Sequence, residues 1–435
     1  MSLSFQNRAN DAQQLIAAAL QAANPATAVS NYLRKEHNNI LVDNQAYSLE
    51  NGRIFLICVG KAAIPMAESA VVILGDSVHA GICLTKESEH LQHPRLPNSM
   101  QFYTGEHPVS GEKSIAATTA IANLLSQTTA NDIVLCLISG GCSALLTQPL
   151  LPLADWQTLN KALLASGCSI NDFNIVRRQL DAVKGGGLAQ WAAPAQVATL
   201  ILSDVIGNDL KAIGSGPTVP TTETGAAATA VLEKYKLHEQ LPASIWAKIE
   251  KALKSSASQV VLNQVQNKII GDVQMAAQAM AKQAEAIGFA PTILTTHLEG
   301  EAKEAGRFAA ALAKDLQPAN CLILGGETTV TLTGNGIGGR NLEVALSASI
   351  GIENEPNTLI FTLATDGDDG PTHCAGAMVT GMSVENGRNQ NLDAQRYLAN
   401  NDSYTYFSHL PNHLIKTGPT GTNVNDLICI LKYTD

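Results

Sequence analysis

Short, almost continuous apolar runs alternate with alanine-rich helical stretches along most of the chain, and this alternation constrains the fold more than any other feature. Strands that are apolar on both faces are typical of parallel sheets covered by helices on both sides. In the first half of the chain the runs are RIFLICVG (53–60), GICLTK (81–86), MQFYTG (100–105), DIVLCLIS (132–139) and VATLILSD (197–204). The pattern therefore predicts an α/β fold with a buried parallel sheet.

The second half repeats this alternation after a polar helical segment that follows residue 220 and is a candidate interdomain segment. Strands are predicted at 267–272, 290–296, 319–326 and 357–367, with a last strand near the C-terminus. Short runs at 321–325 and 329–333 lie close enough to predict a hairpin, and hence a mixed sheet. Because 435 residues are too many for one core, we expect two domains.

The composition excludes several classes of function. The net charge is −10 and no basic stripe occurs, so nucleic-acid binding is not expected. The eight cysteines form no C-x-x-C pair, which argues against a zinc site and for a reducing compartment. The N-terminus is typical of an amphipathic helix, and no apolar run approaches the roughly 20 residues that span a bilayer. We therefore expect a cytoplasmic protein that does not bind membranes.

Two cations stand at predicted helix starts, where the helix dipole disfavours positive charge. Lys61 follows the strand 53–60, and Arg340 follows the stretch GNGIGG (334–339). Lys61 does not belong to a Walker A loop, because Ala62 replaces the Ser or Thr that would hold magnesium. A surface lysine is the alternative interpretation of Lys61. An anion bound jointly by the cation and by the N–H groups of the helix start explains both Lys61 and Arg340 better.

Glycine-rich turns after strands are candidate phosphate sites. Ser139, Gly140 and Gly141 lie between a buried strand and a helix, where exposed backbone N–H groups form an anion nest. A tight turn with a serine cap is the alternative. The stretch VKGGGLA, which contains Lys184, is a weaker candidate for the same role.

Carboxylates also follow predicted strands. Asp204 could coordinate a metal or take a proton, or it could cap a turn, and Glu327 follows the strand 319–326. A later glycine-rich loop holds a cluster that suits a hard cation with oxygen ligands, with a solvated turn as the alternative: Asp366, Asp368 and Asp369.

Gly334, Gly336 and Gly339 fall on the spacing G-x-G-x-x-G, between a β-prone and a helix-prone run, as in a dinucleotide fingerprint. That fingerprint follows the first strand of a βαβ unit and has an acid about 20 residues further on. Here the glycines come late, and the nearest suitable acids lie in a polar turn. We favour a bound phosphate with cations and a carboxylate-held Mg²⁺, as phosphoryl transfer requires. Its predicted nucleotide contacts are Ser139, Gly140, Gly141, Lys184, Gly336, Gly338 and Gly339.

Nine motifs occur in order along the chain: VGKAA (59–63), GEHPV (105–109), LISGGCSALL (137–146), VKGGGLA (183–189), SDVIGNDLKAIGSGPT (203–218), GGET (325–328), GGRNLE (338–343), ATDGDDGPT (364–372) and TGPTGTNVNDL (417–427). Together they resemble the class II glycerate kinase family. Its members are also often labelled hydroxypyruvate reductases, and their C-terminal part is the MOFRL domain. The resemblance runs from about residue 10 to the C-terminus.

The resemblance implies two α/β domains with the active site in the cleft between them. Residues 1–240 would form an N-terminal Rossmann-like domain with a parallel sheet, and residues 241–435 a MOFRL-type domain with a mixed sheet. It also implies Mg²⁺-dependent transfer of the ATP γ-phosphoryl group to D-glycerate, with 2-phosphoglycerate as the usual product. The expected partners are D-glycerate and a nucleotide, and a homodimer is the expected assembly.

The family's functional positions fall on Lys61, Asp204, Glu327, Arg340 and Asp366. Lys61 and Arg340 would neutralise charge on the phosphoryl group or on the glycerate carboxylate. Asp366 or Glu327 would hold Mg²⁺, and Asp204 would orient or deprotonate the attacking hydroxyl. The chain departs from the family pattern after Asp366, where it has His373 and Cys374.

Two alternatives stay open. An NAD(P)H-dependent hydroxypyruvate reductase would suit the glycine spacing, and His107 is the well-placed candidate for its catalytic histidine. A non-catalytic sugar-phosphate sensor would bind an organic phosphate without turnover, although no DNA-binding module accompanies the domains.

Overall fold

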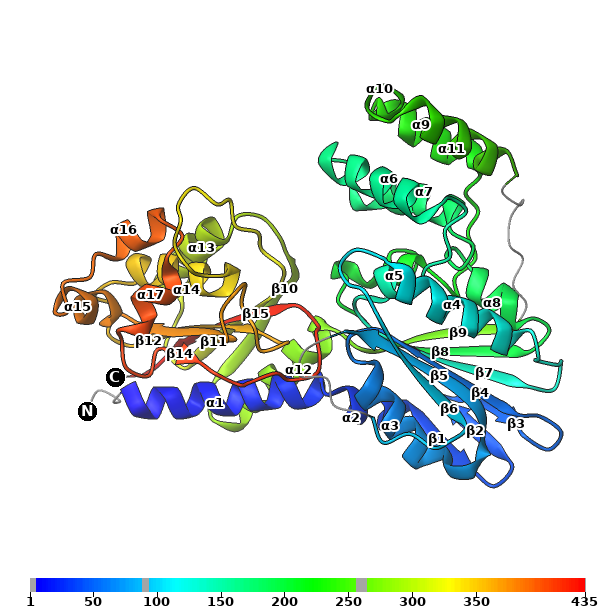
Figure 1. Ribbon diagram of the computed structural model, residues 1–435. Coiled ribbons are helices and arrows are strands. Elements are labelled where there is room, and N and C mark those ends of the chain that lie inside the picture. Colours follow the sequence, from blue (N-terminus) through cyan, green and yellow to red (C-terminus); the bar gives the residue numbers. More distant parts are fainter. Residues whose placement is uncertain (1–4, 88–93, 256–263, 435) are drawn as a thin grey trace. The chain divides into compact units, whose positions relative to one another are not determined.

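We analysed the protein in a computed structural model that describes residues 5–87, 94–255 and 264–434 (Figure 1). The chain forms two compact units. The parallel-sheet unit comprises Pro25–Ile270, and the mixed-sheet unit comprises Gly271–Asp435 together with Met1–Asn24. Two α/β domains, one parallel and one mixed, are therefore confirmed. None of the described helices is long and apolar enough to cross a bilayer.

The units divide the chain at different positions from the expected 240/241 boundary, because tertiary contacts override sequence order. Helix α11 (Ala243–Ser255) and strand β9 (Val265–Gly271) complete the parallel-sheet unit. The N-terminal helix α1 (Phe5–Ala22) instead belongs to the mixed-sheet unit. There Arg8 Nη1 donates to Pro356 O at 2.6 Å, and Tyr433 OH donates to Asp11 Oδ2 at 3.1 Å.

The larger sheet of the parallel-sheet unit has the strand order β6-β5-β4-β7-β8-β9. Its first five strands pair in parallel: β4 (Ile54–Val59), β5 (Val78–Lys86), β6 (Met100–Gly105), β7 (Ile133–Ile138) and β8 (Gln196–Leu202). Every residue of β4 and β7 is buried, as the apolar runs predict. The chain runs outward from β4 through β5 and β6, then returns to the other side of β4 as β7. The sheet thus reverses its order between β4 and β7, where open α/β sheets bind ligands at the strands' carboxyl ends.

Helices cover both faces of this sheet, with α4 and α8 on one side and α2 and α3 on the other. The helices are α2 (Pro25–Tyr32), α3 (Ala63–Leu74), α4 (Glu112–Leu125), α5 (Cys142–Leu145) and α8 (Gly187–Ala192). Three short 3₁₀ turns follow strands or helices, at Gly75–Ser77, Ile206–Asn208 and Ile213–Ser215. A small antiparallel sheet that the sequence analysis did not predict adds β1 (Leu33–Glu36), β2 (Asn39–Val42) and β3 (Gln45–Ser48).

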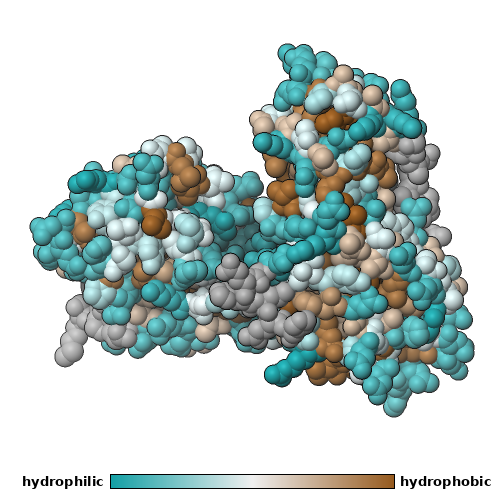
Figure 2. Space-filling model, viewed as in Figure 1, coloured by the Kyte–Doolittle hydropathy of each residue, from teal (hydrophilic) through white to brown (hydrophobic). Residues whose placement is uncertain are grey.

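A helical layer with its own core completes the parallel-sheet unit. It contains α6 (Leu153–Ala165), α7 (Ile170–Leu180), α9 (Gly225–Lys234), α10 (Leu237–Gln240) and α11. The segment after residue 220, a candidate interdomain segment, thus packs on α6 and α7 within one unit, around the buried Trp156. Figure 2 shows apolar atoms gathered over this layer, and Leu164 and Ile170 at the α6–α7 connection are exposed.

The sheet of the mixed-sheet unit has the order β10-β11-β15-β12-β13-β14. Its strands are β10 (Ala290–Leu298), β11 (Asn320–Gly326), β12 (Thr358–Ala364), β13 (Gly376–Thr380), β14 (Leu414–Ile415) and β15 (Asp426–Lys432). The predicted hairpin was wrong, because within 329–333 only Thr329 makes a bridge, with Glu301. The sheet is mixed because the C-terminal strand β15 inserts antiparallel between β11 and β12.

Helices also cover both faces of the mixed sheet (Figure 1). Helices α1 and α12 pack together on one face, and α13 and α14 pack together on the other. The bounds are α12 (Val273–Ala286), α13 (Ala302–Asp315), α14 (Arg340–Gly351), α15 (Ser383–Arg388), α16 (Ala394–Ala399) and α17 (Ser403–Ser408).

Candidate active site

Lys61 and the loop Ser139–Gly141 lie at the point where the parallel sheet reverses its order. Lys61 follows β4 and the loop follows β7, and these two strands are neighbours. The two turns are tied together, since Lys61 N donates to Gly140 O at 2.8 Å and Ala62 N donates to Ser139 Oγ at 3.0 Å. Ser139 Oγ therefore links this loop to the start of α3, and it does not cap the helix α5 that follows the loop.

Asp204, at the end of β8, lies directly over Gly140. A Cβ atom at Gly140 would be 2.1 Å from Asp204 Oδ2, so only glycine fits beneath this carboxylate. Gly141 has φ 84°, and a Cβ there would be 3.2 Å from both Lys61 Cγ and His107 Cδ2. The structure thus brings together an ammonium, a carboxylate and an imidazole around two glycines.

Burial sets the charge state of these groups. It raises the pKa of Asp204, and the positive charge of Lys61 opposes that rise. Burial, followed by the charges of Lys61 and Lys86, lowers the pKa of His107 to about 4, so this imidazole is neutral at pH 7. From the sequence, His107 is a candidate only for the catalytic histidine of a reductase. Its position just after β6 was the signal that would have placed it beside Lys61.

Lys184 has partners of its own within the protein. Its Nζ atom is buried and donates to Ser143 O at 2.8 Å and to Leu146 O at 3.0 Å. The following glycines join two loops, since Gly185 N and Gly186 N donate to Ser215 O and Gly216 O. This arrangement gives Lys184 and its glycines a structural role, and it does not support the predicted contact with a nucleotide.

In the mixed-sheet unit, Arg340 is held by two carboxylates of the protein. Its Nε and Nη2 atoms donate to Asp426 at 2.5 and 3.1 Å, and Nη1 lies 3.1 Å from Glu327 Oε1. Burial raises the pKa of Asp426, and the bonds from Arg340 oppose this effect. Asp426 was not predicted as a site residue, although it lies in the motif TGPTGTNVNDL. The two acids explain how a cation is tolerated at the start of α14.

The stretch with the G-x-G-x-x-G spacing packs against the chain at 400–403. Gly336 N donates to Asn400 O at 3.0 Å, and a Cβ at Gly336 would be 2.3 Å from Asp402 Cβ. Likewise, a Cβ at Gly338 would be 2.4 Å from Ser403 Oγ. Close backbone approach therefore accounts for glycine at these positions.

The start of α14 is already occupied by a carboxylate of the protein. Asn341 N and Leu342 N donate to Asp369 at 3.0 and 2.8 Å, and a Cβ at Gly339 would be 2.3 Å from Asp369 Cγ. Burial raises the pKa of Asp369 to about 6. The start of α14 therefore does bind an anionic group, but that group is the side chain of Asp369. This geometry, with no strand directly before the glycines, argues against a dinucleotide site and against nucleotide contacts by Gly336, Gly338 and Gly339.

Gly336→Ala should destabilise the mixed-sheet unit without changing the KM for the nucleotide. The added Cβ would clash with the backbone of Asn400 and the Cβ of Asp402. Neither group can shift without moving the main chain. Overpacking of this kind costs about 1–3 kcal/mol, so thermal unfolding should shift to lower temperature. Gly300→Ala is the control for strain alone, since Gly300 has positive φ but an open Cβ position. A raised nucleotide KM with unchanged stability would contradict this explanation.

The two predicted metal ligands differ in their surroundings. Glu327 pairs with Arg340, which makes it a poor Mg²⁺ ligand in this arrangement. Asp366 accepts a bond from Asp368 N at 3.2 Å and shares a glycine-rich loop with the exposed Asp368. Over the part of the chain that the structure describes, no three His, Cys, Asp or Glu side chains cluster as a metal site. Mg²⁺ commonly uses one or two carboxylates plus substrate phosphates, so Asp366 fits this ion and Glu327 does not.

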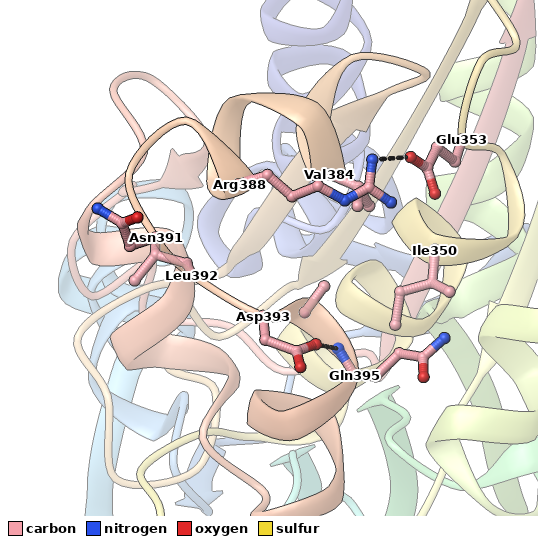
Figure 3. A pocket seen from close by; sticks show the side chains of 9 residues that line it. Ile350, Glu353, Val384, Arg388, Asn391, Leu392, Asp393 and Gln395 are labelled. Carbon is pink, nitrogen blue, oxygen red and sulfur yellow. Dashed lines mark hydrogen bonds and ion pairs between the residues drawn. The ribbon is translucent and has the colours of Figure 1, made fainter.

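A surface pocket of about 360 Å³ in the mixed-sheet unit does not coincide with these residues (Figure 3). Its charged groups have partners, since Arg388 pairs with Glu353 and Asp393 accepts from Gln395 N. None of the predicted site residues lines it, so it carries no functional argument.

Comparison with known proteins gives matches along nearly the whole chain. Residues 11–250 match a domain of unknown function, DUF4147, and residues 320–426 match the MOFRL family. A D-glycerate 2-kinase from Thermotoga maritima is 41% identical over 385 residues, which are 86% of this chain and 90% of that protein. A glycerate 2-kinase from Pyrococcus horikoshii is 36% identical over 428 residues, 95% of each chain.

A solved structure shows the same fold. The crystal structure of glycerate kinase from Thermotoga maritima matches with a TM-score of 0.89 and 38% identity. The match covers 98% of this chain and 100% of that one. The nine motifs, the two units and these matches agree, and the chain belongs to the class II glycerate kinase family.

Proposed function

We propose that this protein is a glycerate kinase that transfers the γ-phosphoryl group of ATP to D-glycerate, giving 2-phosphoglycerate and ADP. The observation that carries the proposal is the convergence of Lys61, Asp204 and the Ser139–Gly141 loop at the reversal point of the parallel sheet. Relatives named glycerate 2-kinase, similar over most of the chain, support the same reaction.

Phosphoryl transfer depends mainly on positioning and on stabilising negative charge. Lys61 supplies a positive charge beside the glycine loop and stabilises the anionic oxygens of the transferring group. Asp204 lies next to Lys61 and, when ionised, accepts the proton of the attacking glycerate hydroxyl. His107 is neutral at pH 7 and therefore adds a hydrogen-bonding group rather than a second cation.

Arg340 supplies the corresponding cation of the mixed-sheet unit. Its guanidinium is oriented by Asp426 and Glu327, so a phosphate or carboxylate would meet a cation whose geometry is already set. Asp366 would hold Mg²⁺, which when bound neutralises charge on the nucleotide phosphates. The free cysteines, eight among the described residues, suit a reducing compartment, and we propose the cytoplasm. A homodimer stays a prediction.

Two assays on one preparation test this function. The first follows ADP release from Mg-ATP with D-glycerate, and the second follows oxidation of NADH and NADPH with hydroxypyruvate. We expect ADP release that requires both glycerate and Mg²⁺, and no oxidation above background. Oxidation without ADP release would establish the reductase instead. Binding of 2-phosphoglycerate without either reaction would favour the sugar-phosphate sensor.

A further inference from the structure

Two adjacent arginines on α7 differ in how their charge is balanced. Arg178 has a carboxylate partner, since its Nε and Nη2 atoms donate to Glu223 at 2.7 and 2.6 Å. Its Nη1 atom also donates to Lys211 O at 2.9 Å. Arg177 has no carboxylate of the described residues within ion-pair distance. Arg178 is thus a structural residue, whereas the charge of Arg177 lacks a counterion.

Arg177 nevertheless has a fixed position. Its guanidinium stacks on the Phe173 ring at 5.1 Å, and its Nη2 atom donates to Ser143 O at 2.7 Å. The Nε atom is buried and has no hydrogen-bond partner in the structure. Burial lowers the pKa of the guanidinium, which means that its surroundings disfavour the charge. A buried donor without a partner is uncommon and costly, so its presence calls for an explanation.

The surroundings of Arg177 contain more positive than negative charge. Lys184 and Asp181 are the neighbouring charged residue types, and their side chains lie 3.8 Å apart. The Asp181 carboxylate already accepts bonds from Thr147 Oγ1 at 2.5 Å and Gln148 N at 3.0 Å. The Asp181 carboxylate pairs with Lys184, and no carboxylate of the described residues pairs with Arg177. Burying an unpaired charge is unfavourable in general, and an anionic ligand would offset that cost.

Arg177 also lies beside the candidate active site. Ser143, whose carbonyl it contacts, is two residues beyond Gly141 in the loop that follows β7. Burial raises the pKa of the Cys142 thiol to about 12. The charge of Asp204 adds to this rise and that of Arg177 opposes it, so Cys142 lies near both groups. Arg177 and Ser143 are each only partly buried.

We propose that Arg177 binds a pair of anionic oxygens of a substrate at the glycine loop. This inference rests on the proposed kinase function and adds a binding residue to it. A guanidinium matches both a carboxylate, as on glycerate, and a phosphate, as on ATP, with two parallel hydrogen bonds. The Nε atom, which has no partner in the protein, and a terminal N–H group of Arg177 would be the donors. Lys61, in the same unit, provides another cation for the second of these anions.

The test compares KM values for the two substrates in the full-length protein. Arg177→Gln should raise the KM for either D-glycerate or ATP by about 10–100-fold, with the other KM within about twofold. A shift in the glycerate KM identifies the carboxylate as the ligand, and a shift in the ATP KM identifies the phosphate. Arg34→Gln is the matched control, because Arg34 is exposed in the same unit, on β1.

Arg177→Lys separates binding from folding. It keeps the charge but loses the planar pair of donors, so it should shift the same KM by a smaller factor. If both variants fold and both KM values stay within twofold of the wild type, the inference is wrong, even if kcat falls. In that case the active wild type would still support the kinase. If the wild type itself releases no ADP, the proposed function fails, and this inference fails with it.

Discussion

Lys61→Met should reduce kcat/KM for ATP-dependent phosphorylation of glycerate by at least about 10²–10³-fold, the usual cost of removing one group that stabilises transition-state charge. The side chain reaches the glycine loop, where its Cγ atom lies close to the Cβ position of Gly141. Methionine has a similar length and stays apolar, so it removes the charge and leaves the packing nearly unchanged. The loss should therefore appear in turnover rather than in stability.

Steady-state kinetics together with circular dichroism and thermal unfolding would check this expectation. Lys161→Met is the matched control, because Lys161 is an exposed lysine of α6 in the same unit. The control should keep wild-type activity. Normal turnover by a folded Lys61→Met protein would remove Lys61 from the mechanism, and a loss of folding would show that its role is structural.

Asp204→Asn should reduce kcat by about 10²–10⁴-fold, which is the usual contribution of a positioned proton acceptor. Asparagine has nearly the same shape over Gly140 but cannot take the proton. Stability at pH 7 should be equal or higher. Because burial raises the folded-state pKa of Asp204 above its unfolded value, ionisation favours the unfolded chain as the pH rises, and the substitution removes this effect.

The same carboxylate predicts a pH dependence. Asp204 accepts a proton only when ionised, so the kcat of the wild type should fall as the pH drops through the pKa of this group. Since burial raises that pKa, the fall should occur at a higher pH than for an ordinary aspartate. The residual activity of Asp204→Asn should lack this acid limb. Asp76→Asn, at an exposed position, is the control. An acid limb that persists in Asp204→Asn would assign it to another group.

Much of the parallel-sheet unit could be predicted from local pattern. Strands that are buried on both faces carry apolar residues throughout, so β4, β7 and β8 stand out as continuous runs. In a parallel sheet all carboxyl ends lie at one edge, and residues that directly follow such strands are therefore neighbours. This reasoning was enough to select Lys61, Ser139–Gly141 and Asp204, which the structure brings together.

Pairing between distant segments was not predictable in this way. Arg340 and Asp426 are 86 residues apart, and their ion pair depends on β15 inserting between β11 and β12. The spacing G-x-G-x-x-G matched a fingerprint, but the reason for the glycines is the close approach of the chain at 400–403 and the carboxylate of Asp369. The spacing shows where the glycines are. It does not show which atoms leave no room for a Cβ there, because those atoms belong to segments distant in the sequence.

The same distinction applies to the cations. Lys61, Lys184, Arg340 and Arg177 all lie near glycine-rich motifs, and residue type alone cannot rank them. Their hydrogen-bond and ion-pair partners distinguish them. Lys184 donates to two backbone carbonyls, and Arg340 pairs with two carboxylates. Arg177 has a buried donor without a partner. The apolar pattern specifies which segments become strands because burial acts on each segment locally. The partner of each charge depends on which segments the completed fold places side by side, and that is a property of the whole chain.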